Sequence, residues 1–203
     1  MPVCDFGSPA GVPVVALVAS AGGLQALTDV LERLPSELPA SVVVLLHQDP
    51  DRPADVLRKL LANRSALPVS LAEDRQPLIA SRVLVIPPGR HLLVTATRRV
   101  SVFKSGVFPP NRPSADLLFA TMASALGPRA IAVVLSGTGH DGATGATAIH
   151  ACGGTVIATD KTTSAEYGMP RATIERDHAI DHIVALKDIA NLIDQTVRGP
   201  QTR

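Results

Sequence analysis

Short runs of apolar residues recur along the chain and alternate with stretches whose apolar residues recur at helical spacing. The apolar runs predict strands near 13–19, 41–47, 68–72, 130–136, 154–159 and 180–185. The helical stretches lie near 22–34, 53–63, 113–126, 141–151 and 187–197. Strands that are apolar throughout are typical of parallel sheets buried on both faces. We therefore expect an α/β fold, a doubly wound, mostly parallel sheet with helices on both faces.

The interval 81–108 breaks this rhythm. Two apolar segments, 83–86 and 91–94, flank the sequence Pro87-Pro88-Gly89-Arg90, which is typical of a turn. This pattern predicts an antiparallel hairpin formed by 83–86 and 91–94, with a further strand over 100–103. We expect the hairpin to be an appendage of the parallel sheet and not a separate domain.

A length of 203 residues with 46% hydrophobic and 18% charged residues is typical of one globular domain with a sizeable core. We predict an N-terminal segment over 1–12, one folded domain over 13–197 and a flexible tail over 198–203.

The charge balance argues against a polyanionic partner, because 19 Lys and Arg residues face 18 Asp and Glu residues. Four Phe, one Tyr and no Trp leave few rings for stacking on bases. No apolar run approaches the roughly 18 residues of a membrane span. Cys4 and Cys152 form no metal-like pair or disulfide framework, and the start lacks a secretory signal. We expect a soluble, cytoplasmic protein without nucleic-acid binding, membrane insertion or a metal.

Ser20 is the first candidate for chemistry. It ends the apolar run 13–19 and is followed by Ala21-Gly22-Gly23 and a helical stretch. This order brings the hydroxyl to the carboxyl edge of the sheet, beside the free N–H groups of a helix start. A helix N-cap is the simpler alternative for such a serine. The setting is similar to a nucleophile elbow, although Val18 stands where the first glycine of Gly-x-Ser-x-Gly would be.

His47 and Asp141 occupy corresponding places after two other strands. His47 ends the run 41–47, and Asp141 lies in the glycine-rich sequence that follows 130–136. A satisfied core histidine and a helix N-cap are the structural alternatives. The glycine-rich loop 137–145 would also suit a phosphate, but it lacks the lysine of a P-loop. The remaining histidines are less well placed: His91, His140, His150, His178 and His182.

The carboxyl ends of parallel strands meet at one edge of an open sheet, where ligands bind. A hydroxyl, an imidazole and a carboxylate at that edge are the groups of a serine hydrolase. The order Ser20, His47, Asp141 differs from the Ser, Asp, His order of α/β-hydrolases.

Several motifs occur in register with one known family. They are Ala19-Ser20-Ala21-Gly22-Gly23, His47, Pro87-Pro88-Gly89-Arg90-His91, Asn111-Arg112-Pro113-Ser114-Ala115-Asp116-Leu117-Leu118-Phe119, Leu135-Ser136-Gly137-Thr138-Gly139-His140-Asp141-Gly142 and Tyr167-Gly168-Met169-Pro170-Arg171. From about Val14 to about Ile193 the chain resembles the catalytic domain of the CheB-type chemotaxis protein-glutamate methylesterases.

This resemblance implies a cofactor-free serine esterase that hydrolyses glutamate methyl esters on the cytoplasmic helices of chemoreceptors, with deamidation of receptor glutamines as a related activity. It carries the nucleophile, base and orienting acid onto Ser20, His47 and Asp141. Backbone N–H groups of Ala21 and Thr138 are the expected oxyanion donors. The chain departs from the family at Val18, usually glycine, and at Thr138, often methionine.

Many family members carry a phosphorylatable receiver domain before the catalytic domain. Ser20 comes too early in this sequence for one, so we expect a stand-alone catalytic domain, and whether a separate receiver protein acts beside it stays open. Two other hypotheses compete with the esterase. One is a catalytically silent scaffold that binds a signalling partner, and the other is a nucleotide or phosphate binder that uses the loop 137–145.

Overall fold

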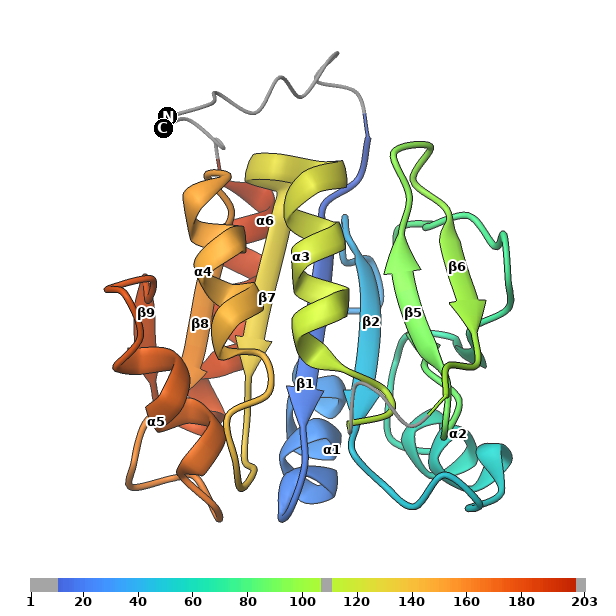
Figure 1. Cartoon of the computed structure of the whole chain (residues 1–203), viewed down its shortest axis with the longest axis horizontal. Coiled ribbons are helices and arrows are strands. Elements are labelled where there is room, and N and C mark those ends of the chain that lie inside the picture. Colours follow the sequence, from blue (N-terminus) through green and yellow to red (C-terminus); the bar gives the residue numbers. More distant parts are fainter. Residues whose placement is uncertain (1–10, 107–110, 200–203) are drawn as a thin grey trace.

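Seven parallel strands form the central sheet of the protein, whose computed structural model describes residues 11–106 and 111–199 (Figure 1). Their order is β3-β4-β2-β1-β7-β8-β9. The strands are β1 (Val14–Ala19), β2 (Ser41–Leu46), β3 (Val69–Leu71), β4 (Arg82–Val85), β7 (Ala130–Val134), β8 (Thr155–Thr159) and β9 (His182–Val184). The chain passes from β1 to β2, which lies on one side of β1 in the sheet, whereas β7 lies on the other side of β1. This reversal beside β1 is the switch point at which doubly wound sheets bind ligands.

Helices cover both faces of the sheet, and α3 and α4 lie in front of it in the view of Figure 1, with α1 and α6 behind. The helices are α1 (Gly23–Arg33), α2 (Ala54–Ala62), α3 (Ala115–Leu126), α4 (Ala143–Ala151), α5 (Gly168–Ile174) and α6 (Ile189–Arg198), with short 3-10 turns η1 (Gly127–Arg129) and η2 (Leu186–Asp188). The predicted α/β architecture is confirmed.

Alternation along β1 explains the two helical layers. Val15, Leu17 and Ala19 join the core with α1 and α6, whereas Val14 and Val18 join the core with α3 and α4. All six residues of β1 are buried, which is why the strand is apolar throughout.

The antiparallel appendage is present, but the predicted pairing is wrong. Its strands are β5 (His91–Val94) and β6 (Val100–Phe103), which pair with each other. The segment 83–86 instead contributes β4, which lies parallel between β2 and β3 in the main sheet. Val83, Leu84 and Val85 are all buried, as a strand covered on both faces requires. The Pro87-Pro88-Gly89-Arg90 sequence is therefore a connection out of the sheet and not a hairpin turn.

The other predicted elements lie within about two residues of the observed ones, except that α5 was not predicted. The helix α6 extends to Arg198, one residue into the predicted tail. Most of the predicted N-terminal segment and tail lies outside the described residues.

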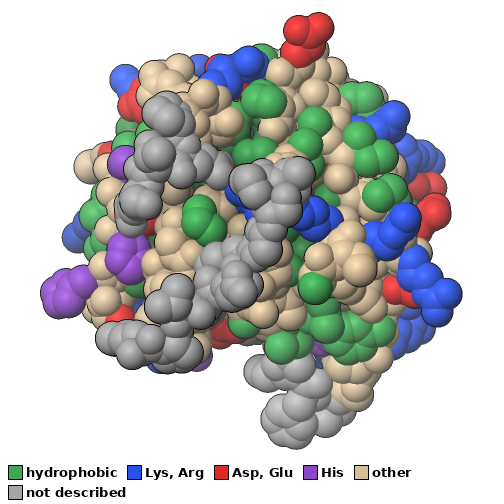
Figure 2. All heavy atoms as spheres, turned by 90° about the horizontal axis from the view of Figure 1, so that it is seen from above, with side chains coloured by type: hydrophobic (Ala, Val, Ile, Leu, Met, Phe, Trp, Pro, Cys, Tyr) green, Lys and Arg blue, Asp and Glu red, His purple; other side chains and the backbone are tan. Residues whose placement is uncertain are grey.

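Figure 2 views the face at the amino ends of the strands, where basic and acidic side chains lie next to one another around the margin. Within residues 11–106 and 111–199, no helix has the length and apolar character needed to cross a membrane.

Candidate active site

Ser20 and His47 lie side by side at the carboxyl edge of the sheet. Ala19 pairs with Leu46 in the register of β1 and β2, and the N–H of His47 donates to the Ala19 carbonyl at 2.9 Å. The two residues therefore follow directly opposite positions on strands that are roughly 4.8 Å apart. Both also line one cavity of about 470 Å³.

The turn after Ser20 is built from residues without bulk. Gly22 adopts the left-handed conformation with φ of 69°, and α1 begins at the next residue. A side chain on Gly137 would place its Cβ 2.9 Å from the Ser20 Cβ and 2.3 Å from the Met169 Sδ. Ser20 itself is not among the residues with positive φ, which distinguishes this turn from a strained nucleophile elbow.

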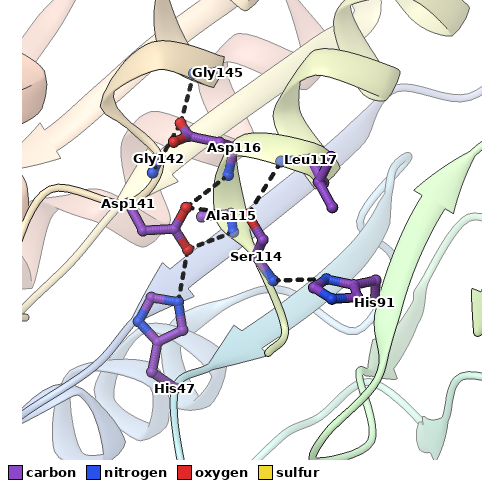
Figure 3. A network of polar contacts seen from close by, with 9 residues as sticks. All are labelled: His47, His91, Ser114, Ala115, Asp116, Leu117, Asp141, Gly142 and Gly145. Atoms are coloured by element: carbon purple, nitrogen blue, oxygen red, sulfur yellow. Dashed lines mark hydrogen bonds and ion pairs between the residues drawn. The ribbon is translucent and has the colours of Figure 1, made fainter. Parts of the chain in front are cut away.

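His47 is held through one ring nitrogen. Its Nε2 lies 2.9 Å from Oδ2 of Asp141, and the two side chains are 15% and 6% exposed (Figure 3). Facing an ionised carboxylate, Nε2 carries the proton. The free lone pair is then on Nδ1, where the ring can act as a base.

Asp141 is anchored at the N-terminus of α3. Its carboxylate accepts the N–H groups of Ala115 at 2.7 Å and Asp116 at 3.1 Å, and the hydroxyl of Ser114 at 3.2 Å. Burial by itself would raise the pKa of Asp141, but the hydrogen bonds from His47 and the two amides hold it below its usual value. Asp141 is therefore ionised at neutral pH. It does not cap its own helix, because Gly142 is the N-cap residue of α4.

Asp116 makes the reciprocal contacts, because it lies in α3 and caps the start of α4. Its Oδ1 accepts the N–H groups of Gly142 at 3.0 Å and Gly145 at 2.8 Å, at the start of α4 (Figure 3). Burial raises the pKa of Asp116, and the nearby charge of Asp141 adds to the rise, against the two amides. The start of α3 is thus capped by Asp141, from the loop before α4, and the start of α4 is capped by Asp116, from within α3.

A second histidine supports the same helix start. His91 is fully buried, its Nδ1 accepts the Ser114 N–H at 3.3 Å, and its Nε2 lies 2.8 Å from the Ser105 hydroxyl. Burial lowers the pKa of His91 and the Arg112 charge lowers it further, whereas Asp141 opposes the shift. The sequence marked His91 as part of a motif but gave no role to Ser114, Asp116 or this histidine. Contacts between elements distant in the sequence define those roles.

Ser136 joins the loops around Ser20 through three hydrogen bonds. Its carbonyl accepts the Ser20 N–H at 2.9 Å, and its hydroxyl donates to the Ala21 carbonyl at 2.8 Å. The same hydroxyl accepts the N–H of Glu166 at 2.9 Å. The backbone N–H groups of Ala21 and Thr138, the expected oxyanion donors, make no hydrogen bond to any other described residue. They are therefore available to a ligand at this edge.

The cavity is lined by side chains from α1, the end of β2 and the following loop. Besides Ser20 and His47 its lining residues are Gly22, Leu24, Gln25, Leu46, Gln48, Asp49 and Arg52. Among the described residues, no three His, Cys, Asp or Glu side chains are grouped so as to hold a metal ion.

Comparisons with known proteins agree on one family. Residues 15–193 match the family described as CheB methylesterase. A protein-glutamate methylesterase/protein-glutamine glutaminase of Myxococcus xanthus is 37% identical over 92% of this chain and 52% of its own length. The corresponding protein of Moorella thermoacetica is 39% identical over 95% of this chain and 46% of its own length. The chain thus spans about half the length of these curated relatives.

The crystal structure of the Thermotoga maritima CheB methylesterase catalytic domain superposes with a TM-score of 0.86 at 32% identity. The match covers 93% of this chain and 100% of that one. The two chains therefore share one fold over nearly their whole length.

Proposed function

The chain belongs to the CheB methylesterase family, and on that premise we propose that it is a serine esterase acting on glutamate methyl esters of chemoreceptors. One observation carries the proposal. The imidazole of His47 is fixed to Asp141 through Nε2, while the ring lines the same cavity as the Ser20 hydroxyl. These are the nucleophile, base and orienting acid of acyl transfer.

In the first half of the reaction, Nδ1 of His47 takes the Ser20 proton as the hydroxyl oxygen attacks the ester carbonyl. The bond to the methoxy group then breaks, and Nδ1 returns the proton so that methanol leaves. Ser20 is left esterified to the glutamyl side chain. The charge of Asp141 stabilises the imidazolium that exists between these steps.

In the second half, water gives a proton to Nδ1 of His47 as its oxygen attacks the acyl carbonyl on Ser20. The bond between that carbonyl and the Ser20 oxygen then breaks, Nδ1 returns the proton to the Ser20 oxygen, and glutamate is released. The same sequence on a glutamine would release ammonia, and both relatives carry the name protein-glutamine glutaminase. The proposed oxyanion donors are the N–H groups of Ala21 and Thr138, each worth about 10²–10³ in rate. Because the donor is backbone, threonine at position 138 in place of methionine retains it.

The proposed macromolecular partners are the methylated cytoplasmic helices of chemoreceptors, which places the reaction in the cytoplasm. Regulation by a separate receiver protein is compatible with this function.

The test is methanol release from a carboxyl-methylated receptor fragment, together with labelling by a serine-directed fluorophosphonate. We expect Ser20→Ala to abolish both signals. Ser70→Ala, which alters an exposed serine of β3, is the matched control and should leave both unchanged. Equal methanol release by wild type and Ser20→Ala would rule the proposal out. Binding of the fragment without release or labelling would identify a silent scaffold.

A further inference from the structure

Exposed apolar side chains gather beside the catalytic cavity. Within the described residues, the exposed large hydrophobic side chains are Leu24, Val56, Leu60, Ile79 and Ile183. Three of them line a single groove between α1 and α2, here called the α1–α2 groove. Its lining residues are Leu24, Leu46, Gln48, Arg52, Val56, Leu57 and Leu60.

The α1–α2 groove continues the catalytic cavity. Both hollows share Leu24, Leu46, Gln48 and Arg52 in their lining. A glutamyl side chain is short, so the backbone that carries an ester to Ser20 must lie across the mouth of the cavity. The part of the substrate that flanks the ester then covers the α1–α2 groove.

A positive charge marks the junction of the two hollows. Arg52 is exposed, and its guanidinium makes no ion pair or hydrogen bond within the described part of the chain. The one acid among the described residues that line the cavity, Asp49, has one carboxylate oxygen occupied by the Asp51 N–H at 3.0 Å. Arg52 is therefore available to a carboxylate on a partner.

We propose that the α1–α2 groove docks an acidic, amphipathic helix of the substrate, namely the helix that carries the methyl ester. Its apolar stripe contacts Val56 and Leu60, and a carboxylate near the ester pairs with Arg52. The groove presents side chains and no open strand edge, which suits a helix laid in a groove better than an added strand. This inference rests on the proposed esterase function.

The test compares a protein ester with a small one. Val56→Asp and Leu60→Asp alter the groove at residues that do not line the cavity. We expect each to lower kcat/KM for a carboxyl-methylated receptor fragment about tenfold, as loss of one important interface contact does. Hydrolysis of p-nitrophenyl acetate should not change. Ile79→Asp is the matched control, because Ile79 is 47% exposed and Val56 45%.

Binding separates failure of the docking surface from failure of the esterase. Affinity for the methylated fragment is measured in the Ser20→Ala background, where no turnover occurs. Val56→Asp and Leu60→Asp should weaken binding of the fragment. Arg52→Gln should weaken it too, and should also reduce the dependence of the affinity on salt concentration. Wild-type affinity in the groove variants, or equal losses on both esters, would overturn the docking surface. Binding of a separate receiver domain is measured on the same variants. If the groove variants lose that binding and keep their affinity for the receptor fragment, the docking surface is also overturned. A wild type that hydrolyses neither ester would refute only the esterase.

A second inference comes from the buried His91, which takes no part in the proposed chemistry. Hydrogen bonds connect it to the catalytic base through Ser114 and Asp141 (Figure 3). Because Nδ1 of His91 accepts the Ser114 N–H, the ring must be neutral with its proton on Nε2. Arg112 and Asp141 are the charged groups that act on this ring, and Phe103 packs against it at 5.5 Å between centroids.

We infer that His91 is a positioning residue, which fixes the first turn of α3 and through it the carboxylate of Asp141. His91→Phe keeps an aromatic ring but loses the acceptor, and we expect kcat on a small ester to fall about tenfold with KM unchanged.

His91→Asn places an oxygen near the position of Nδ1 and should recover most of the activity. Wild-type kcat in both variants, or an Asn variant as impaired as the Phe variant, would refute the positioning role. If His91→Phe does not fold, His91→Leu takes its place in the same comparison.

Discussion

The N-termini of α3 and α4 are built alike, yet their carboxylates behave differently. Asp141, which precedes α4, accepts amides from the start of α3, and Asp116, within α3, accepts amides from the start of α4. Both carboxylates lose solvent on folding. The pKa of Asp141 is nevertheless lowered, whereas the pKa of Asp116 is raised.

The number and kind of donors explain the difference. For Asp141 burial is the largest influence, but His47, two amides and the Ser114 hydroxyl donate to its two oxygens. For Asp116 burial is also the largest influence, while two amides share a single oxygen and the Asp141 charge repels it. This pair of crossed caps, Asp141 on α3 and Asp116 on α4, thus contains one carboxylate that stays ionised at neutral pH and one whose pKa is raised.

The largest expected effect comes from removing the charge that distinguishes Asp141. In Asp141→Asn with the amide oxygen in place of Oδ1, that oxygen keeps the Asp116 amide and the Ser114 hydroxyl. The NH₂ group then takes the place of Oδ2, where it faces His47 and leaves the Ala115 amide without its acceptor. The ring then accepts through Nε2 and carries its proton on Nδ1, so it cannot deprotonate Ser20. We expect kcat for methanol release to fall about 10⁴-fold.

The melting temperature of Asp141→Asn should fall by only a few degrees, because one buried amide, that of Ala115, loses its acceptor. Asp116→Asn is the control, since it makes the same change at the other cap, and its kcat should remain near wild type. A similar loss of kcat in both variants would mean that the two caps do not differ in function.

Pushing the two helices apart tests whether the crossed caps require close packing. An Ala Cβ at Gly145 would lie 2.6 Å from the Phe119 Cβ and 2.9 Å from the Asp116 carbonyl. We expect Gly145→Ala to lower the free energy of unfolding by about 1–3 kcal/mol, as overpacking does. Urea denaturation gives the value. Gly106→Ala, where a Cβ meets nothing within 4 Å, should show no comparable loss.

Removing the structural carboxylate alone has a smaller expected effect. Asp116→Ala leaves the amides of Gly142 and Gly145 without their acceptor and should cost about 1 kcal/mol of unfolding free energy, as loss of a helix cap does. Asp116→Asn retains an acceptor oxygen and should cost less. Denaturation of both variants checks the order, and an Asn variant that is less stable than the Ala variant would contradict it.

The opposite pKa shifts predict opposite pH dependences of stability, with the smallest effects. Asp141, with a lowered pKa, contributes stability that is present above its unfolded value of about 3.9 and is lost as the pH falls below it. Asp116, with a raised pKa, loses stability as the pH rises from about 3.9 through its folded pKa. Unfolding free energies of the two Asn variants between pH 3 and pH 6 should therefore deviate from wild type with opposite slopes. Parallel slopes would show that the two shifts share one direction.

The sequence predicted the elements that repeat a simple pattern. Apolar runs and helical spacing located the sheet, and the strand ends led to Ser20, His47 and Asp141, whose imidazole and carboxylate the structure brings together. The predicted hairpin pairing was wrong because an apolar run such as 83–86 has the same pattern in a buried parallel strand and in a hairpin strand. Apolar content alone does not show whether 83–86 pairs with 91–94 or with strands of the main sheet. The topology of the sheet determines this pairing.

The supporting residues could not be deduced in the same way. The roles of Asp116, His91 and Ser114 depend on contacts between segments 23 to 29 positions apart in the sequence. An aspartate after a strand predicts a cap on the next helix, and here Asp141 caps the preceding helix instead. A local rule identifies a helix-capping residue type but not which helix it serves.

The crossed caps have a consequence for how activity is acquired. The partners Asp116 and Asp141 are 25 positions apart, and neither carboxylate finds its amides until both helices have docked. A chain refolding from urea would regain helical circular dichroism before it regains turnover, because isolated turns form without the docked pair. The time course of the recovery of the proposed esterase activity would then report when α3 and α4 dock and form their two caps, which is a late folding event.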